Sequence, residues 1–224
     1  MRQRILARSA DTQTRILDAA EQLLADFGIE AASMRQVTTL AKANLAAVNY
    51  HFGSKEELIV QVYARRLRPV NAERLRLLDE LEQRQGGQPP TATDILTCYV
   101  APVIRLVHDQ ANGGERFMRL LGRALYEPGS YLTPLFKEEL EPVLARFTQA
   151  LRRVLPELSD EELFWRVHFA GGAMAYTLAQ THRLELVSKG ACDVSDPDAI
   201  TKRLVEFIAA GMRGEHKPVA PPQV

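Results

Sequence analysis

Helical periodicity constrains this chain more than any other feature of its sequence. Apolar residues recur at spacings of three and four almost everywhere, and no stretch alternates apolar with polar residues as a half-buried strand would. The chain has 224 residues, 46% of them hydrophobic, which is enough for one large domain or for a small domain beside a larger one. The sequence therefore predicts an all-α fold of about nine helices.

Capping residues and helix breakers divide this pattern into segments. The first helix is expected to open near Asp11 or Thr12 and to stop at Gly28, and two short helices are expected to follow the N-caps Ser33 and Asn44. Further helices are expected over residues 55–85, 93–110, 114–127, 133–155, 159–187 and 197–212.

Two of these helices are expected to begin with a capping box, in which a serine and a glutamate three residues later bind each other's backbone. The pairs are Ser54 with Glu57 and Ser159 with Glu162. The mid-helix Pro69 is expected to kink the long fourth helix.

These boundaries give four parts. We expect a basic flexible arm over residues 1–10 and a three-helix unit over 11–57. A larger helical body is expected over 58–213, followed by a disordered tail over 214–224.

Charge is balanced over the whole chain but not along it, with 28 basic and 28 acidic residues in total. Residues 31–55 contain Arg35, Lys42 and Lys55 but no acid, and the first ten residues contain three arginines and no acid. Duplex DNA carries one negative charge per about 1.7 Å of axis, so carboxylates on an inserted helix would be repelled. The local clustering therefore favours nucleic-acid binding by the N-terminal quarter.

Two short helices joined by a four-residue turn match a helix-turn-helix, whose second helix enters the major groove. On that helix Leu45, Val48 and Phe52 share one side and are expected to seat it. Asparagine can pair with adenine, alanine can touch thymine methyls, and Tyr and Lys suit phosphate oxygens. A helix N-terminus, such as that after Ser54, also binds anions. The residues expected at DNA are Arg35, Lys42, Asn44, Leu45, Ala46, Ala47, Asn49, Tyr50, His51, Ser54 and Lys55.

Two segments carry a more specific signal: "TRILDAAEQLLADFGIEAASMRQV" and "AAVNYHFGSKEELI". On these segments residues 12–60 resemble the DNA-binding domain of the TetR/AcrR family of bacterial transcriptional regulators. Lys42 departs from the family pattern because it stands at a turn position that is usually glycine, where φ is expected to be positive. Asn49 departs because many members have tyrosine there. The string "NLAAVNYHFGSK" is similar to a subgroup that includes fatty-acid-responsive regulators.

The resemblance implies a ligand-responsive regulator, in most members a repressor, that binds a palindromic DNA operator. It also implies that the larger helical body encloses a small hydrophobic effector, such as a lipid or acyl compound. The candidate pocket residues are Tyr99, Val103, Phe117, Leu121, Arg123, Tyr126, Phe147, Trp165, His168, Phe169 and Tyr176. Most of these side chains would equally suit an ordinary helical core.

The helix expected over 159–187 is apolar on two sides, so that one side can face the chain's own core and the other a partner. The family forms a twofold dimer through its last two long helices, and the resemblance implies a homodimer here. The candidate interface residues are Trp165, Gly172, Tyr176, Ile200, Leu204, Phe207, Ile208 and Gly211. The alternative is that these residues of both helices belong to the core of a single chain.

Other functions find little support. Two distant cysteines argue against a disulfide framework or a zinc site, and no apolar run is long enough for a membrane span or a signal peptide. A cytoplasmic location without membrane contact is therefore expected. No catalytic residue, metal ligand or cofactor is expected, because no catalytic or phosphate-binding motif appears. A helical protein-interaction module using residues 33–58, or an enzyme without a recognisable motif, remains as an alternative.

Overall fold

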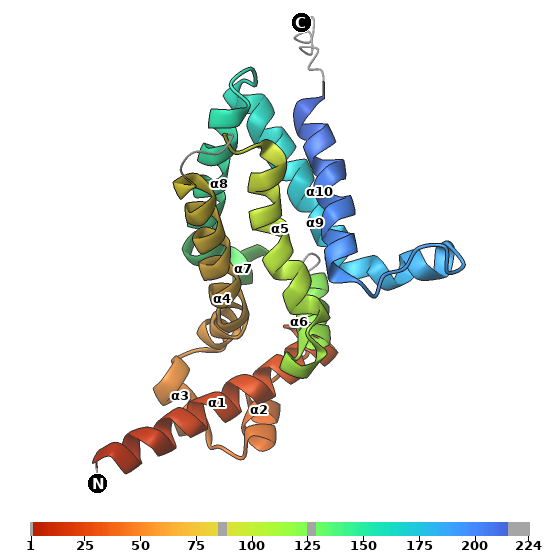
Figure 1. Ribbon diagram of the computed structural model, residues 1–224. Coiled ribbons are helices and arrows are strands. Elements are labelled where there is room, and N and C mark those ends of the chain that lie inside the picture. The colour runs from red at the N-terminus through yellow and green to blue at the C-terminus, as the bar shows by residue number, and fades with distance from the viewer. Residues whose placement is uncertain (1, 85–88, 125–128, 215–224) are drawn as a thin grey trace, which may run out of the picture.

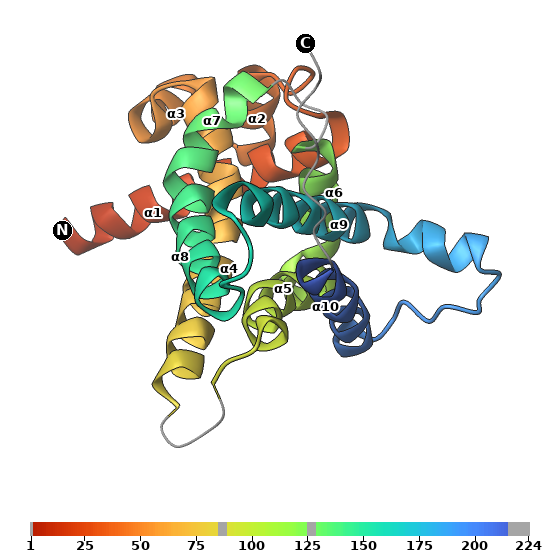
Figure 2. The ribbon, with the colours of Figure 1, turned by 90° about the horizontal axis from the view of Figure 1, so that it is seen from above.

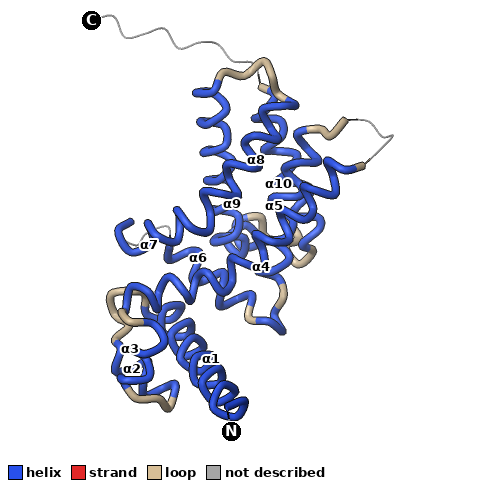
Figure 3. Tube along the Cα trace, turned by 90° about the vertical axis from the view of Figure 1, so that its left-hand side faces the viewer, coloured by secondary structure: helices blue, strands red, loops and turns tan. Residues whose placement is uncertain are grey.

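The computed structural model describes residues 2–84, 89–124 and 129–214, and over these ranges the chain folds into ten α-helices without a strand (Figures 1 and 3). The expected all-α fold is confirmed. Helices α1, α2 and α3 form a small unit at the foot of the molecule in Figure 1, and the remaining helices form a larger body above it.

The small unit consists of α1 (Arg2–Phe27), α2 (Met34–Ala41) and α3 (Leu45–Phe52). Its core contains fully or almost fully buried apolar side chains from all three helices, among them Ile16, Leu24, Val37, Val48 and Phe52. Side-chain oxygens of Ser33 and Asn44 accept hydrogen bonds at the starts of α2 and α3, as the sequence predicts. The local capping pattern therefore sets the ends of both short helices.

The first helix begins at Arg2, which corrects the expected start near Asp11. Residues 2–10 thus belong to α1 and do not form the separate arm expected over 1–10. The segment "RQRILARSA" contains neither proline nor glycine, so nothing in it interrupts the backbone hydrogen-bond ladder. The end of α1 agrees with expectation, since Gly28 takes a positive φ of 86° and donates to the carbonyl of Leu24.

Helix α4 (Lys55–Gln83) connects the small unit to the body and runs as one helix through Pro69. It contacts α1 and also packs against α5 (Ala92–His108) and α8 (Glu141–Val154). The side chain of Ser54 accepts from the amide of Glu57, as expected for a cap. The Glu57 carboxylate, however, accepts from Gln61 and not from Ser54, so the full capping box is not formed. At Ser159 the side chain likewise accepts from the amide of Glu162, and the Glu162 carboxylate binds Arg166.

The rest of the body contains α6 (Gly114–Ala124), α7 (Gly129–Leu135), α9 (Asp160–Val187) and α10 (Pro197–Arg213). The single helix expected over 133–155 is instead divided into α7, a π turn over Phe136–Leu140, and α8. Pro142 stands at the start of α8, and because proline has no N–H, the regular ladder is interrupted there. The tail from residue 215 onward lies outside the described residues.

Helix α9 begins beside α8 at the top of the body and descends beside α10 (Figure 1), and seen from above it runs from α8 past α6 (Figure 2). The last turns of α9, where residues 183–187 are exposed, and the loop that leads to α10 extend away from the other helices (Figures 1 and 2). This part of α9 therefore has little contact with the chain's own core.

Candidate DNA-binding surface and effector cavity

Two buried side chains hold α3 against the other two helices of the small unit. Val48 and Phe52 are buried against α1 and α2, as their spacing predicts. Leu45 does not join them: it is 53% exposed, because it is the first residue of α3 and lies at the end of the helix. Leu45 therefore belongs to the outer surface, together with the exposed Ala46 and Asn49.

The turn between α2 and α3 is built around Lys42, whose φ of 50° confirms the expected positive value. The amide of Ala43 donates to the carbonyl of Thr38 at 3.0 Å and that of Lys42 to Thr39 at 3.3 Å, which is the Schellman arrangement of a helix end. Arg15 of α1 donates to the carbonyl of Ala41 at 2.9 Å. These bonds hold the turn although a non-glycine residue in this conformation costs about 1–2 kcal/mol.

Asn44 has a structural role in addition to any contact with DNA. Its side-chain oxygen accepts a hydrogen bond from the amide of Ala47 at 2.8 Å and so caps α3. The oxygen is therefore occupied, which leaves the NH₂ group of the side chain to contact a phosphate or a base.

The outer surface of α3 ends in a large exposed aromatic. Tyr50 is 82% exposed, and its ring meets the half-buried ring of His51 edge-on at a centroid distance of 5.1 Å. An exposed apolar ring with a terminal hydroxyl is suited to lie along the sugar-phosphate backbone.

Three positively charged side chains lie around this helix and form no ion pair with another described residue. Arg35 and Lys42 are exposed, and Lys55 is half-buried at the first position of α4. None of the ion pairs formed among the described residues involves any of the three. Ser54 caps α4 next to Lys55, where the free backbone N–H groups of the first turn form an anion-binding position.

The small unit is attached to the body by buried ion pairs between α1 and α4. Glu21 of α1 is completely buried and binds both Arg65 and Arg66 of α4. Arg66 also donates to the carbonyl of Asn112, in the turn between α5 and α6, at 2.7 Å. One side chain therefore connects the small unit, α4 and that turn.

A second attachment runs from α6 to the end of α1. Arg123 donates to the carbonyls of Ala25 at 2.9 Å and Asp26 at 2.6 Å, and Arg119 pairs with the Asp26 carboxylate at 3.2 Å. Arg123 thus caps the C-terminus of α1, whose last carbonyls have no partner within the helix. Arg123, a predicted pocket residue, therefore lies at the contact between the small unit and the body.

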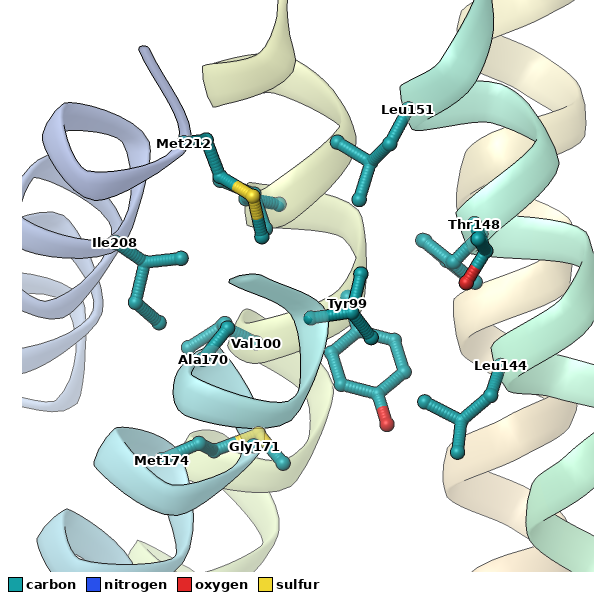
Figure 4. A pocket seen from close by; sticks show the side chains of 13 residues that line it. Tyr99, Val100, Leu144, Thr148, Leu151, Ala170, Gly171, Met174, Ile208 and Met212 are labelled. Atoms are coloured by element: carbon teal, nitrogen blue, oxygen red, sulfur yellow. The ribbon is translucent and has the colours of Figure 1, made fainter. Parts of the chain in front are cut away.

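The body contains a narrow apolar cavity of about 40 Å³ between α5, α8, α9 and α10 (Figure 4). Tyr99 and Phe147, both predicted pocket residues, line it, and their rings meet edge-on at 5.0 Å. The other lining residues were not predicted, although Leu144, Thr148 and Leu151 repeat at helical spacing and indicate the inward face of α8. The full lining is Leu96, Tyr99, Val100, Leu144, Phe147, Thr148, Leu151, Val167, Ala170, Gly171, Met174, Ile208 and Met212.

The remaining predicted pocket residues lie elsewhere. Val103 and Phe117 are buried in the core, Leu121 is half-buried, and Tyr126 falls outside the described residues. Four others lie exposed on α9, where the rings of Trp165 and Phe169 stack at 5.7 Å. These four are Trp165, His168, Phe169 and Tyr176.

The two apolar sides expected on α9 are both present. One side packs against the core, with Leu163 and Leu178 buried, whereas Trp165, Phe169 and Tyr176 on the other side are more than half exposed. On α10 the predicted interface residues divide in the same way. Ile200, Leu204 and Ile208 are buried within the chain, and Phe207 is 70% exposed. Gly172 and Gly211 are exposed.

A large cleft of about 840 Å³ lies between the outer part of α9, the following loop and α10. Tyr176 and Phe207 both line it. An apolar surface of this kind marks a site of contact with another molecule.

The described residues hold no group of three or more His, Cys, Asp or Glu side chains arranged to bind a metal ion. Over the same ranges no helix combines the length and the apolar character needed to span a membrane.

Comparison with known protein families gives two matches. Residues 16–62 match the model described as bacterial regulatory proteins, tetR family, and residues 97–211 match a tetracyclin repressor-like C-terminal domain. The first match contains α2 and α3, and the second contains most of the helical body.

Individual relatives agree with these matches. The chain is 39% identical over 59 residues to the HTH-type transcriptional repressor NicS of Pseudomonas putida, which is 26% of this chain and only 28% of that repressor's length. The fold resembles that of the fatty acid degradation regulator FadR from Bacillus halodurans, with a TM-score of 0.64, 14% identity, and coverage of 91% of this chain and 97% of the other. It also resembles FadR from Bacillus subtilis in complex with stearoyl-CoA, with a TM-score of 0.58, 14% identity, and coverage of 88% and 98%.

Proposed function

This chain belongs to the tetR family of bacterial transcriptional regulators, and we propose that it represses transcription from a palindromic DNA operator, which it binds as a homodimer. We further propose that a small apolar effector weakens this binding. Because its operator would be genomic DNA, its site of action would be the cytoplasm.

The observation that carries the proposal is the outer surface of α3. This surface combines Asn49 and the 82% exposed Tyr50 with a flanking set of cations that have no acidic partner among the described residues. Its charge suits phosphates, and Asn49 suits the edge of an adenine in the major groove.

The homodimer has a physical reason in the DNA. One eight-residue helix reads too few base pairs for useful specificity, whereas two symmetry-related helices read two half-sites about 34–36 Å apart. The exposed apolar surface of α9 and α10 supports a twofold contact there, since such a surface is costly to leave in water. Trp165, Gly172, Tyr176, Phe207 and Gly211 are the proposed interface residues.

Control by an effector is supported by the apolar cavity and by the ion pairs that join the two units. The cavity of about 40 Å³ is far smaller than the roughly 300–1,000 Å³ of typical ligand sites, so an effector must spread the surrounding helices. Helix α4 lies against the body and also carries Arg65 and Arg66, which bind Glu21 of α1. A shift of α4 would therefore move the DNA-reading unit of each protomer.

A charge-reversal experiment tests DNA binding directly. Retardation of the DNA upstream of the protein's own gene is compared for the wild type, Lys55→Glu and the control Lys137→Glu, at several salt concentrations. Lys55 adjoins the proposed phosphate site, whereas Lys137 is exposed in the π turn of the body. We expect Lys55→Glu to abolish retardation and Lys137→Glu to leave it unchanged. Equal retardation by both variants would exclude the proposed surface.

A further inference from the structure

Arg74 of α4 is a buried cation without an acidic partner. Its side chain is almost completely buried at 2% exposure, and none of the ion pairs among the described residues involves it. Arg166, the other fully buried arginine described, shows the usual arrangement, since it pairs with Glu162 at 2.7 Å. A buried charge without a counter-ion is costly, which makes Arg74 the exception that needs an explanation.

The contacts of Arg74 are weak for a guanidinium, which carries five N–H donors. Nε donates to the carbonyl of Tyr99 at 2.7 Å, and one terminal nitrogen donates to the side-chain oxygen of Asn71 at 3.1 Å. The other terminal nitrogen meets only the sulfur of Met174 at 3.9 Å. A thioether is a poor acceptor, and burial lowers the pKa of Arg74 from its ordinary value.

Arg74 lies directly behind the apolar cavity. The two side chains that cover it, Tyr99 and Met174, also line the cavity (Figure 4). The guanidinium carbon lies 4.0 Å from the centroid of the Tyr99 ring, where the ring partly compensates the charge. Met174 is flexible and unbranched, so it can turn aside at little cost and bring the guanidinium into contact with the cavity.

We propose that Arg74 binds the carboxylate of an amphipathic acid whose hydrocarbon chain occupies the cavity between α5, α8, α9 and α10. The carboxylate replaces the Met174 sulfur and forms the two parallel hydrogen bonds that a guanidinium makes best. The chain lies against the leucine, phenylalanine and methionine side chains of the cavity. Entry of the chain spreads the helices, and the carboxylate binds α4 itself, so both parts of the ligand act on the helix that leads to the DNA-reading unit. This inference deepens the proposed effector control and depends on it.

A matched pair of ligands tests the assignment on the full-length protein. Dodecanoate and dodecanol share a hydrocarbon chain and differ in the carboxylate, and their affinities are measured by the shift in melting temperature across a concentration series. We expect the wild type to bind dodecanoate at least about tenfold more tightly than dodecanol. Equal affinities would overturn the proposal. Dodecanoyl-CoA is the third probe: tight binding of the thioester without binding of the free acid would equally contradict a carboxylate site.

Substitutions of Arg74 test whether this residue binds the carboxylate. Arg74→Gln removes the charge and is expected to abolish the preference for dodecanoate while leaving dodecanol affinity unchanged. Arg105→Gln, which changes an exposed arginine of α5, is the control and should keep the preference. If Arg74→Gln does not fold, Arg74→Lys retains the charge but not the planar pair of donors, and it is expected to bind dodecanoate several-fold more weakly. A preference that is undiminished in whichever Arg74 variant folds would overturn the proposal.

A cavity-filling variant tests where the chain lies. Gly171 lines the cavity, and a Cβ added to it would meet no atom within 4 Å. Gly171→Ala should therefore fold, and we expect its methyl group, placed in a cavity of only about 40 Å³, to weaken binding of both dodecanoate and dodecanol. Unchanged binding of both would contradict the assigned cavity. A wild-type protein that retards DNA but shows no preference for the acid would refute this inference alone, whereas a failure to bind DNA would refute the proposed function.

Discussion

Arg66 of α4 donates hydrogen bonds to both carboxylate oxygens of Glu21 in α1, at 2.6 and 3.2 Å. Glu21 is completely buried, and Arg66 also holds the carbonyl of Asn112 in the turn before α6. These two residues therefore join the small N-terminal unit to the two helices of the body that lie nearest to it. Loss of the Glu21 charge should weaken this connection.

We expect Glu21→Gln to lower the free energy of unfolding by roughly 1–3 kcal/mol, because two arginines lose the carboxylate that binds them. Urea unfolding at neutral pH measures the change. Glu73→Gln is the control, since the Glu73 side chain is 41% exposed and pairs with Arg76 within one helix, and it should change stability by less than about 0.5 kcal/mol. Equal losses in the two variants would show that Glu21 contributes no more than a surface ion pair.

The same carboxylate predicts a dependence of stability on pH. Burial alone would raise the pKa of Glu21, but hydrogen bonds and charge from Arg66 and Arg65 outweigh burial and lower the pKa below its ordinary value of 4.5. A lowered pKa in the folded state means that protons bind the unfolded chain more readily, so the contribution is complete above about pH 4.5 and is lost as the pH falls through the folded-state value. Unfolding free energies measured from neutral to acidic pH should fall more steeply for the wild type than for Glu21→Gln. Parallel curves would contradict the lowered pKa.

Lys42→Gly separates the backbone role of the turn from its charge. Glycine adopts the positive φ of this position without strain, but it also raises the conformational entropy of the unfolded chain. We therefore expect a stability gain of no more than about 1 kcal/mol. Lys189→Gly is a close control, because Lys189 has a φ of 53° far from α3. Of these two variants, only Lys42→Gly should weaken DNA binding. It should also reduce the slope of log affinity against log salt concentration by about one. Equal DNA affinities of the two variants would exclude a phosphate contact by Lys42.

Asn49 and Lys55 should differ in what they contribute to DNA binding. Lys55→Ala is expected to weaken binding to all sequences about equally and to flatten the salt slope, since it removes a phosphate contact. Asn49→Ala is expected to relax the preference at one or two base pairs by about 1–3 kcal/mol. Titrations against a set of single-base operator variants at several salt concentrations measure both effects. If Lys55→Ala altered the preferred sequence and left the salt slope unchanged, these roles would be wrong.

The exposed ring of Phe207 should decide the oligomeric state. We expect Phe207→Glu to raise the dimer dissociation constant by at least about tenfold, because it places a charge in an apolar contact. Phe136→Glu is the control, since Phe136 is also exposed but lies in the π turn on another part of the body. Sedimentation velocity across a concentration series measures both. A dimer that is unaffected by Phe207→Glu would place the interface elsewhere.

Features set by neighbouring residues could be predicted from the sequence. The caps at Ser33, Asn44 and Ser54 involve partners only three residues away, so they are visible in the chain itself. The positive φ at Lys42 was predicted from the family pattern, in which a glycine usually occupies this turn position. The early start of α1 was missed because basic charge at a terminus was interpreted as flexibility, although no residue there breaks a helix.

Features set by distant contacts could not be predicted. Arg123 is predicted to lie in the pocket because its charge could anchor a ligand, but its partners are carbonyls of α1 that lie 97 and 98 residues earlier. The two sides of α9 were recognised, yet nothing in their composition says which one meets the core. Aromatic residues such as Trp165 were therefore placed in the pocket as well as in the interface. The cavity depends on how four helices meet, which periodicity within each helix does not fix.

Selection of binding sites from random duplex DNA tests the central claim most directly. The protein is expected to enrich a palindrome whose half-sites are separated by one helical turn, about 34–36 Å, or by a multiple of it, because two copies of α3 read the duplex together. Enrichment of a sequence without twofold symmetry, or of no sequence at all, would contradict the account.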